Sequence, residues 1–160
     1  MKITDLIDEK EALPILAEWH HSEWSHFNPG GTVQKRIEEM QAYLAGHTLP
    51  KMFVSKDGET LLGSAAIIAS DMDTRTDLSP WLASVYVNEE YRKKGVGSDL
   101  VKHVEKYARS AGFPNLYLFT PDQENFYQNL GWAPISREVY RERAVTVMQI
   151  KLEKLSYEAW

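Results

Sequence analysis

The sequence predicts one α/β domain in which about four helices flank a mixed central sheet of about seven strands. The chain has 160 residues, the usual size of a single domain. Short apolar runs rich in β-branched and aromatic residues alternate with longer segments whose apolar residues recur every three or four positions. Neither repeats nor a linker rich in proline, glycine or serine divide the chain, so we expect residues 1–160 to form one domain.

The first 45 residues predict a strand followed by two helices. Residues 1–7 alternate in polarity as a strand does, and residues 11–24 carry a mixed apolar stripe with helical spacing. Pro14 is compatible with that helix because it falls in the first turn. A Pro-Gly-Gly break at residues 29–31 precedes Thr32, a candidate N-cap for a second helix that runs to about residue 45.

The central part predicts a hairpin and a buried strand. Residues 51–56 and 59–70 are two apolar runs joined by Asp57-Gly58, a dipeptide that strongly favours a two-residue hairpin turn. A polar loop over residues 71–80 follows. Residues 81–87 are uncharged and include β-branched and aromatic side chains, which is typical of a buried strand.

The C-terminal part predicts two helices and three strands. Residues 95–111 have the spacing of an amphipathic helix, which Gly112 and Pro114 terminate. Residues 115–120 predict another buried strand, and residues 122–130 predict a short helix that ends at Gly131. Two further strands are expected within residues 132–152, around a turn at residues 141–143.

The composition excludes several classes of protein. With 43% hydrophobic and 26% charged residues the chain is an ordinary globular sequence, and no apolar run approaches the roughly 18 residues of a membrane span. The N-terminus lacks the order of a secretory signal, so we expect a cytoplasmic protein without membrane contact. The absence of cysteine excludes disulfides, a thiolate nucleophile and cysteine-ligated zinc. Because His20 and His21 point to different helix faces, no metal site is expected.

The charges are unevenly distributed along the chain. Residues 1–90 hold seven Lys and Arg against 15 Asp and Glu, whereas residues 91–160 hold 11 against eight. The positive side chains concentrate between Tyr91 and Arg109, which favours an anionic ligand there. An acidic chain with one short basic segment and no nucleic-acid motif is a poor candidate for binding nucleic acid. A small phosphorylated ligand fits better.

The most informative stretch is the turn between the strand at residues 81–87 and the following helix. Gly95 and Gly97 open that basic helix, and N–H groups at a helix N-terminus together with the helix dipole favour a phosphate or pyrophosphate. The turn is not a Rossmann fingerprint, since Leu100 stands at the third glycine position. It is not a P-loop, since no Gly-Lys-Ser/Thr follows.

The same turn resembles the signature Arg/Gln-x-x-Gly-x-Gly/Ala of the GNAT superfamily of acyl-CoA-dependent N-acyltransferases, here Arg92-Lys93-Lys94-Gly95-Val96-Gly97. The resemblance continues upstream in residues 82–87, which are similar to the family's fourth strand. It continues downstream in residues 125–132, which are similar to its Phe-Tyr-x-x-x-Gly-aromatic segment. The resemblance implies the GNAT fold, with a mostly antiparallel sheet, and direct transfer of an acetyl group from acetyl-CoA to a primary amine without a metal.

The resemblance also implies roles for individual residues. The backbone of residues 85–87 would pair with pantetheine, and the Val85 N–H would donate to the oxyanion. Tyr127 would be the general acid that protonates the thiolate of coenzyme A. The residues expected to bind the cofactor are Val85, Tyr86, Val87, Arg92, Lys93, Lys94, Gly95, Val96, Gly97 and Ser98.

The acceptor site and the general base are less defined. The family usually shapes the acceptor site with the first two helices and their loop, so Trp24, His26 and Phe27 are expected there with Asp71. Some members carry a glutamate on the fourth strand, but residues 81–84 offer no carboxylate. The base is therefore open between Asp71, Asp73 and, through a water, His26. Thr120 stands where many relatives have asparagine, which puts that cofactor contact in doubt.

The identity of the acceptor has three interpretations. The acidic loop with Asp71, Asp73 and Asp77 favours a small cationic amine. A protein or peptide N-acetyltransferase is an alternative, and a non-catalytic acyl-CoA-binding regulatory module is another. The partners expected are acetyl-CoA and an amine, and a homodimer is conceivable because the tail at residues 156–160 carries apolar side chains.

Overall fold

A computed structural model describes residues 1–152 of the chain. In this part of the chain one sheet has the strand order β1-β2-β3-β4-β5-β7-β6, and its β4–β5 pair is parallel while its other pairs are antiparallel. The strands are β1 (Lys2–Asp5), β2 (Lys51–Asp57), β3 (Thr60–Ile68), β4 (Trp81–Val87), β5 (Asn115–Thr120), β6 (Ala133–Tyr140) and β7 (Arg143–Lys151). The α-helices are α1 (Leu13–Trp24), α2 (Val33–Met40), α3 (Val96–Ser110) and α4 (Glu124–Asn129).

The predicted elements are confirmed, with two local differences. The turn of the β2–β3 hairpin is formed by Gly58 and Glu59 rather than by Asp57 and Gly58, because Asp57 pairs with Thr60 as the last strand residue. The second helix is α-helical only to Met40 and continues as a 3-10 helix over Gln41–Leu44. The tail at residues 156–160 lies outside the described residues.

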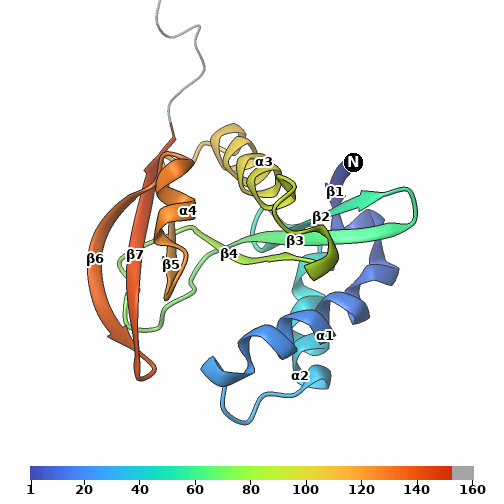
Figure 1. Ribbon diagram of the computed structural model, residues 1–160, viewed down its shortest axis with the longest axis horizontal. Helices are drawn as coiled ribbons and strands as arrows, with labels where there is room; N and C mark the ends of the chain where they lie inside the picture. Colours follow the sequence, from blue (N-terminus) through green and yellow to red (C-terminus); the bar gives the residue numbers. More distant parts are fainter. Residues whose placement is uncertain (153–160) are drawn as a thin grey trace, which may run out of the picture.

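Helices cover both faces of the sheet (Figure 1). On one face, α1 and α2 pack on β2 and β3 through apolar side chains that include Leu16, Met40 and Met52. On the other face, α3 and α4 pack on β3, β4 and β5 through a core that includes Leu100 and Tyr127. Burial of these two apolar layers against the sheet is the main source of the stability of the fold.

The β4 and β5 strands separate soon after they meet. Their register contains one pair, Trp81 with Tyr117, and beyond it the two strands diverge (Figure 1). The first three residues of β4 are buried and the next four are half-buried. The expectation that residues 81–87 are buried throughout was therefore wrong for residues 84–87, because β5 does not cover that side of β4.

A bulge interrupts β4 at the point of divergence. Tyr86 pairs with Ser64 and Ala83 with Ala66, so Ser84 and Val85 together face one residue of β3. Ser84 has a φ of 53°, a left-handed conformation that few non-glycine residues adopt. A bulge of this kind bends a strand and redirects its peptide groups.

Candidate active site

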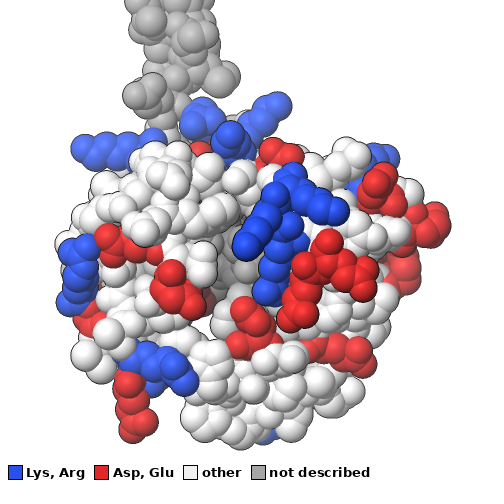
Figure 2. All heavy atoms as spheres, in the orientation of Figure 1, with Lys and Arg blue, Asp and Glu red and all other residues white. Residues whose placement is uncertain are grey.

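A cleft of about 760 Å³ opens where β4 and β5 diverge. One end is lined by the second half of β4, by the turn after it and by the start of α3. The other end is lined by the C-terminal part of α1, by the start of the loop after β3 and by the β6–β7 turn. Figure 2 shows a hollow near the middle of one face, with Lys and Arg side chains on its border and Asp and Glu side chains nearby. The cleft therefore has a basic end and a mixed, partly acidic end.

The turn predicted to hold a pyrophosphate forms the basic end. Lys93 and Gly95 have φ values of 64° and 87°, which turns the chain sharply into α3. The first turn of α3 lines the cleft with Val96, Gly97 and Ser98. Unpaired N–H groups and the helix dipole at such an N-terminus favour an anion. Arg92 donates from Nε to the Val87 carbonyl oxygen at 2.9 Å, which anchors the turn to the end of β4.

Of the residues predicted to bind the cofactor, all but one line the cleft. Lys94 is the exception: its ammonium lies 5.5 Å from the centre of the Tyr91 ring and does not border the cleft. Gly97, in the first turn of α3, faces β4 and α4. A Cβ atom built on it would lie 3.5 Å from the side chains of both Phe126 and Val87. The glycine leaves this space free.

Tyr127 lies on the α4 side of the cleft, opposite α1. Its side chain is almost fully buried, and its ring packs against Phe126 and Trp132 at centroid distances of 5.0 Å and 6.0 Å. Burial, together with the nearby carboxylate of Asp122, raises the pKa of the Tyr127 hydroxyl. The hydroxyl therefore keeps its proton at neutral pH, which a proton donor needs.

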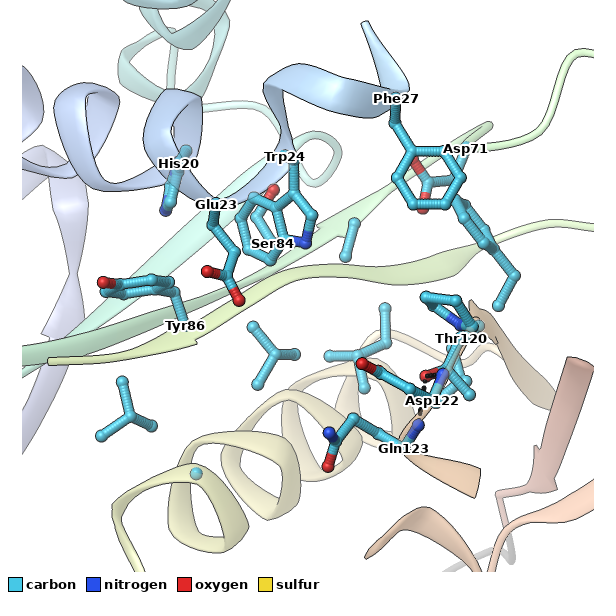
Figure 3. Close-up of a pocket in the computed structure, with 18 of the residues that line it drawn as sticks. His20, Glu23, Trp24, Phe27, Asp71, Ser84, Tyr86, Thr120, Asp122 and Gln123 are labelled. Atoms are coloured by element: carbon cyan, nitrogen blue, oxygen red, sulfur yellow. Dashed lines mark hydrogen bonds between the residues drawn. The ribbon is translucent and has the colours of Figure 1, made fainter. Parts of the chain in front are cut away.

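The four residues predicted for the acceptor, Trp24, His26, Phe27 and Asp71, line the other end of the same cleft. Trp24 and Glu23 project from α1 toward β4 (Figure 3). Burial raises the pKa of the Asp71 carboxyl to about 6, and the positive charges of Arg36 and Arg141 oppose the rise. Asp71 is thus a carboxylate at neutral pH that releases and takes up protons close to that range.

The structure separates the candidates for the base. Asp71 and His26 line the cleft, whereas Asp73 does not. Asp73 lies 3.7 Å from Arg141 on the surface, and Asp77 forms an ion pair with Arg75. Only part of the acidic loop therefore faces the site.

Thr120, which stands where many relatives have asparagine, lines the cleft, and its hydroxyl oxygen is engaged with the backbone. Its Oγ1 accepts hydrogen bonds from the backbone N–H groups of Asp122 and Gln123, at 3.3 and 2.9 Å, and so supports the start of α4 (Figure 3). This arrangement leaves the side chains of Asp122 and Gln123 to border the cleft.

Several lining residues were not predicted from the sequence. Four of them come from segments far apart in the chain and carry no motif: Arg36, Asp122, Tyr140 and Arg141. His20 and Glu23 belong to the segment 20–28 that was expected to shape the acceptor site, but they were not singled out there. Positions 20, 23 and 24 have helical spacing, so His20 and Glu23 lie on the same side of α1 as Trp24. This spacing is the signal in the sequence that could have identified His20 and Glu23 as lining residues. The others are brought to the cleft by the tertiary fold alone.

Two negative observations concern residues 1–152. No group of three His, Asp or Glu side chains there is arranged to hold a metal ion. No helix in this part of the chain has the length and apolar character that crossing a bilayer requires.

Comparison with known proteins gives a consistent result. The sequence profile of the acetyltransferase (GNAT) family matches residues 13–132. An aminoglycoside 6'-N-acetyltransferase solved with coenzyme A is similar in structure, with a TM-score of 0.74 and 16% sequence identity over 97% of this chain and 99% of its own. Aminoglycoside 6'-acetyltransferase type Ii has a TM-score of 0.75 and 18% identity over 97% and 99% of the two chains.

An N-acetyltransferase from Staphylococcus aureus Mu50 has a TM-score of 0.71 and 16% identity, over 96% of this chain and 100% of its own. At such identities the likeness establishes the fold, and it confirms the fold that the sequence resemblance implied. No curated protein matches the sequence at a significant level.

Proposed function

Since the chain belongs to the acetyltransferase (GNAT) family, we propose that it transfers the acetyl group of acetyl-CoA directly to a primary amine of a small cationic molecule. The observation that carries this proposal is the shared cleft. A basic helix N-terminus, the irregular edge of β4 and the buried Tyr127 border one part of it, and a carboxylate with aromatic side chains borders the other.

The basic end fits the pyrophosphate and pantetheine of coenzyme A. The N–H groups at the start of α3 and the side chains of Arg92 and Lys93 offer positive charge to the phosphates. The backbone of residues 85–87 is not covered by β5, so it offers hydrogen-bonding groups to an extended ligand. Gly97 leaves room for that ligand between α3 and α4.

In the proposed reaction, the neutral nitrogen of the acceptor attacks the carbonyl carbon of the thioester. A C–N bond forms, the C–S bond breaks, and coenzyme A leaves as a thiolate. The Val85 N–H is the proposed donor to the oxygen of the tetrahedral intermediate. Tyr127 is the proposed donor of the proton that the thiolate takes up, and Asp71 is our candidate for the group that receives the proton of the amine.

Charge at the acceptor end favours a cation. Glu23 and Asp71 border it with carboxylates, while Arg36 donates to His20 and Ser84, and Arg141 donates to the Phe27 carbonyl oxygen and to Asn28. Glu39 also lines the cleft, and Arg141 lies 3.7 Å from the Asp73 carboxylate. Carboxylates therefore outnumber the two arginines around this end, and a cationic acceptor is electrostatically better matched than an anionic one.

The contacts of Arg141 favour a small acceptor over a peptide. Arg141, at the β6–β7 turn, bridges to the segment after α1 with donor–acceptor distances of 3.0 Å to Phe27 and 2.7 Å to Asn28. All three residues of this bridge line the cleft at its acceptor end. An extended chain would have to displace the bridge, whereas a small amine would not.

Calorimetric titration with acetyl-CoA, followed by an acceptor screen read by release of free thiol, tests the proposal. The panel contains diamines, aminated sugars, acidic amino acids and short peptides at matched ionic strength. We expect binding of acetyl-CoA and turnover with cationic small amines. Preference for acidic amino acids or for peptides would refute the acceptor class, and binding without turnover on any amine would indicate a regulatory module.

A further inference from the structure

A chain of hydrogen bonds, buried at its centre, leads from α2 through α1 to the bulge in β4. Arg36 approaches Nδ1 of His20 from Nη2 at 3.0 Å and from Nε at 3.3 Å. His20 Nε2 lies 2.9 Å from the Ser64 hydroxyl, and that hydroxyl donates to the Ser84 carbonyl oxygen at 2.9 Å. Arg36 also donates to the Ser84 hydroxyl at 3.1 Å. His20 and Ser64 are 2% and 0% exposed, so water does not compete for the contact between them, whereas Arg36 and Ser84 are half-buried.

The direction of every hydrogen bond in this chain follows from the donors available. A guanidinium only donates, so Nδ1 of His20 is an acceptor and carries no proton. The ring proton is then on Nε2, which donates to the Ser64 oxygen. The Ser64 hydroxyl proton is therefore free to be donated to the Ser84 carbonyl. Burial and the charge of Arg36 lower the pKa of His20 to about 3, which keeps the ring in this neutral form.

The carbonyl that this chain holds belongs to the peptide group that also contains the Val85 N–H. In a planar trans peptide the C=O and the N–H point in opposite directions, so a constraint on one sets the other. Ser84 and Val85 have no partner in the β3–β4 register, and the ladder therefore does not set the orientation of this peptide. Val85 borders the cleft.

We propose that His20, Arg36 and Ser64 are positioning residues that orient the Ser84–Val85 peptide and so aim the Val85 N–H at the reacting carbonyl oxygen. This inference rests on the proposed acetyl transfer, in which that N–H stabilises the oxyanion. The network touches neither the phosphate turn nor Tyr127. The network sets the alignment of the Val85 N–H alone. A small misalignment of this donor should lower the rate of acetyl transfer and leave the affinity for acetyl-CoA unchanged.

The test compares Ser64→Ala with Ser55→Ala. Both hydroxyls are 0% exposed on neighbouring strands, but the Ser55 hydroxyl has no hydrogen-bond partner among residues 1–152, so its removal is a matched control for loss of a buried hydroxyl. We expect Ser64→Ala to lower kcat by about 10- to 100-fold while the Kd of acetyl-CoA changes by less than about twofold. Ser55→Ala should match the wild type, and Ser64→Thr, which keeps the donor, should recover most of kcat. Equal kcat in the two alanine variants, or an equal loss of acetyl-CoA affinity and kcat, would overturn the proposal.

The amide resonance of Val85 gives a second measurement that does not need activity. Loss of the hydrogen bond to the Ser84 carbonyl should shift the 15N resonance of Val85 in Ser64→Ala and leave it unchanged in Ser55→Ala. A wild type that transfers no acetyl group would refute the proposed function, and the resonance would still decide whether the network orients this peptide. If the Val85 resonance of Ser64→Ala has the same position as that of Ser55→Ala, the network does not orient the Ser84–Val85 peptide.

Discussion

Replacement of Asp71 by asparagine should stabilise the fold at neutral pH and weaken the reaction. Burial in the cleft raises the pKa of this carboxyl from an ordinary value of 3.8 to about 6. At about 1.4 kcal/mol per pKa unit, the ionised group costs the folded state about 3 kcal/mol relative to the unfolded chain. An amide of the same shape carries no such cost.

The pH dependence of this effect has a definite sign. Below about pH 4 the carboxyl is protonated in both the folded and the unfolded chain, so ionisation contributes no difference. Between about pH 4 and pH 6 the unfolded chain releases its proton first, which favours unfolding. Above about pH 6 the full cost is present, and Asp71→Asn should then gain about 3 kcal/mol over the wild type relative to pH 4, or roughly 6–12 °C in Tm for a chain of this size.

Urea unfolding of both proteins at pH 4, 5, 6 and 7 measures this difference. Asp73→Asn is the control, since its side chain is 73% exposed on the same loop and surface ion pairs contribute less than about 1 kcal/mol. A difference between wild type and Asp71→Asn that stays constant across this pH range would show that the carboxyl is not buried at a cost. The reasoning about the cleft would then be wrong.

The kinetic consequence is independent of the stability measurement. A carboxylate that holds a cationic amine contributes about 1.5–3 kcal/mol as a charged hydrogen bond, so its loss should lower kcat/KM for the amine by roughly 10- to 150-fold. The Kd of acetyl-CoA should not change, because Asp71 lies at the other end of the cleft. In wild type kcat/KM should fall as the pH drops through about 6, and this limb should disappear in Asp71→Asn.

Three other variants test separate parts of the site. Tyr127→Phe should lower kcat by roughly 10²- to 10⁴-fold and leave the calorimetric Kd of acetyl-CoA unchanged; equal turnover would remove Tyr127 as the general acid. Gly97→Glu should abolish acetyl-CoA binding in calorimetry, because the new side chain starts 3.5 Å from Phe126 and Val87 and brings a negative charge to the pyrophosphate; retained affinity would contradict the assigned turn. Gly63→Ala should lower the free energy of unfolding by about 1–3 kcal/mol in urea, because the new Cβ would collide with the Tyr86 carbonyl oxygen. An unchanged urea midpoint would mean that β3 and β4 can move apart without a cost in stability.

Much of the fold and of the cofactor end could be predicted from the sequence because the signals there are local. The bounds of β4 and β5 were predicted to the residue, and α3 within one residue at each end. A strand, a turn and a helix N-terminus are set by residues within a few positions of one another. The glycines at the start of α3 have their effect through backbone conformation and through the N–H groups that immediately follow, which sequence alone displays.

The acceptor end could be predicted only in part. Trp24, His26, Phe27 and Asp71 were expected near it and do line the cleft, but Arg36 and Arg141 were not foreseen. Their contacts join residues 16 to 114 positions apart, and no local pattern encodes which distant group a side chain will meet. The position of Asp73 outside the cleft could not be predicted for the same reason, since it depends on a contact with the distant Arg141.

The sequence by itself determined the order of the elements, the family and the glycine turn that we propose binds the phosphates, since each depends on short-range periodicity, capping and backbone freedom. Tertiary structure alone decided that β4 and β5 part after a single pair, that Ser84 forms a bulge, and that a half-buried arginine, a buried histidine and a buried serine meet at it. It also decided the protonation of Asp71, because desolvation and the charges of distant arginines arise only when the chain is folded.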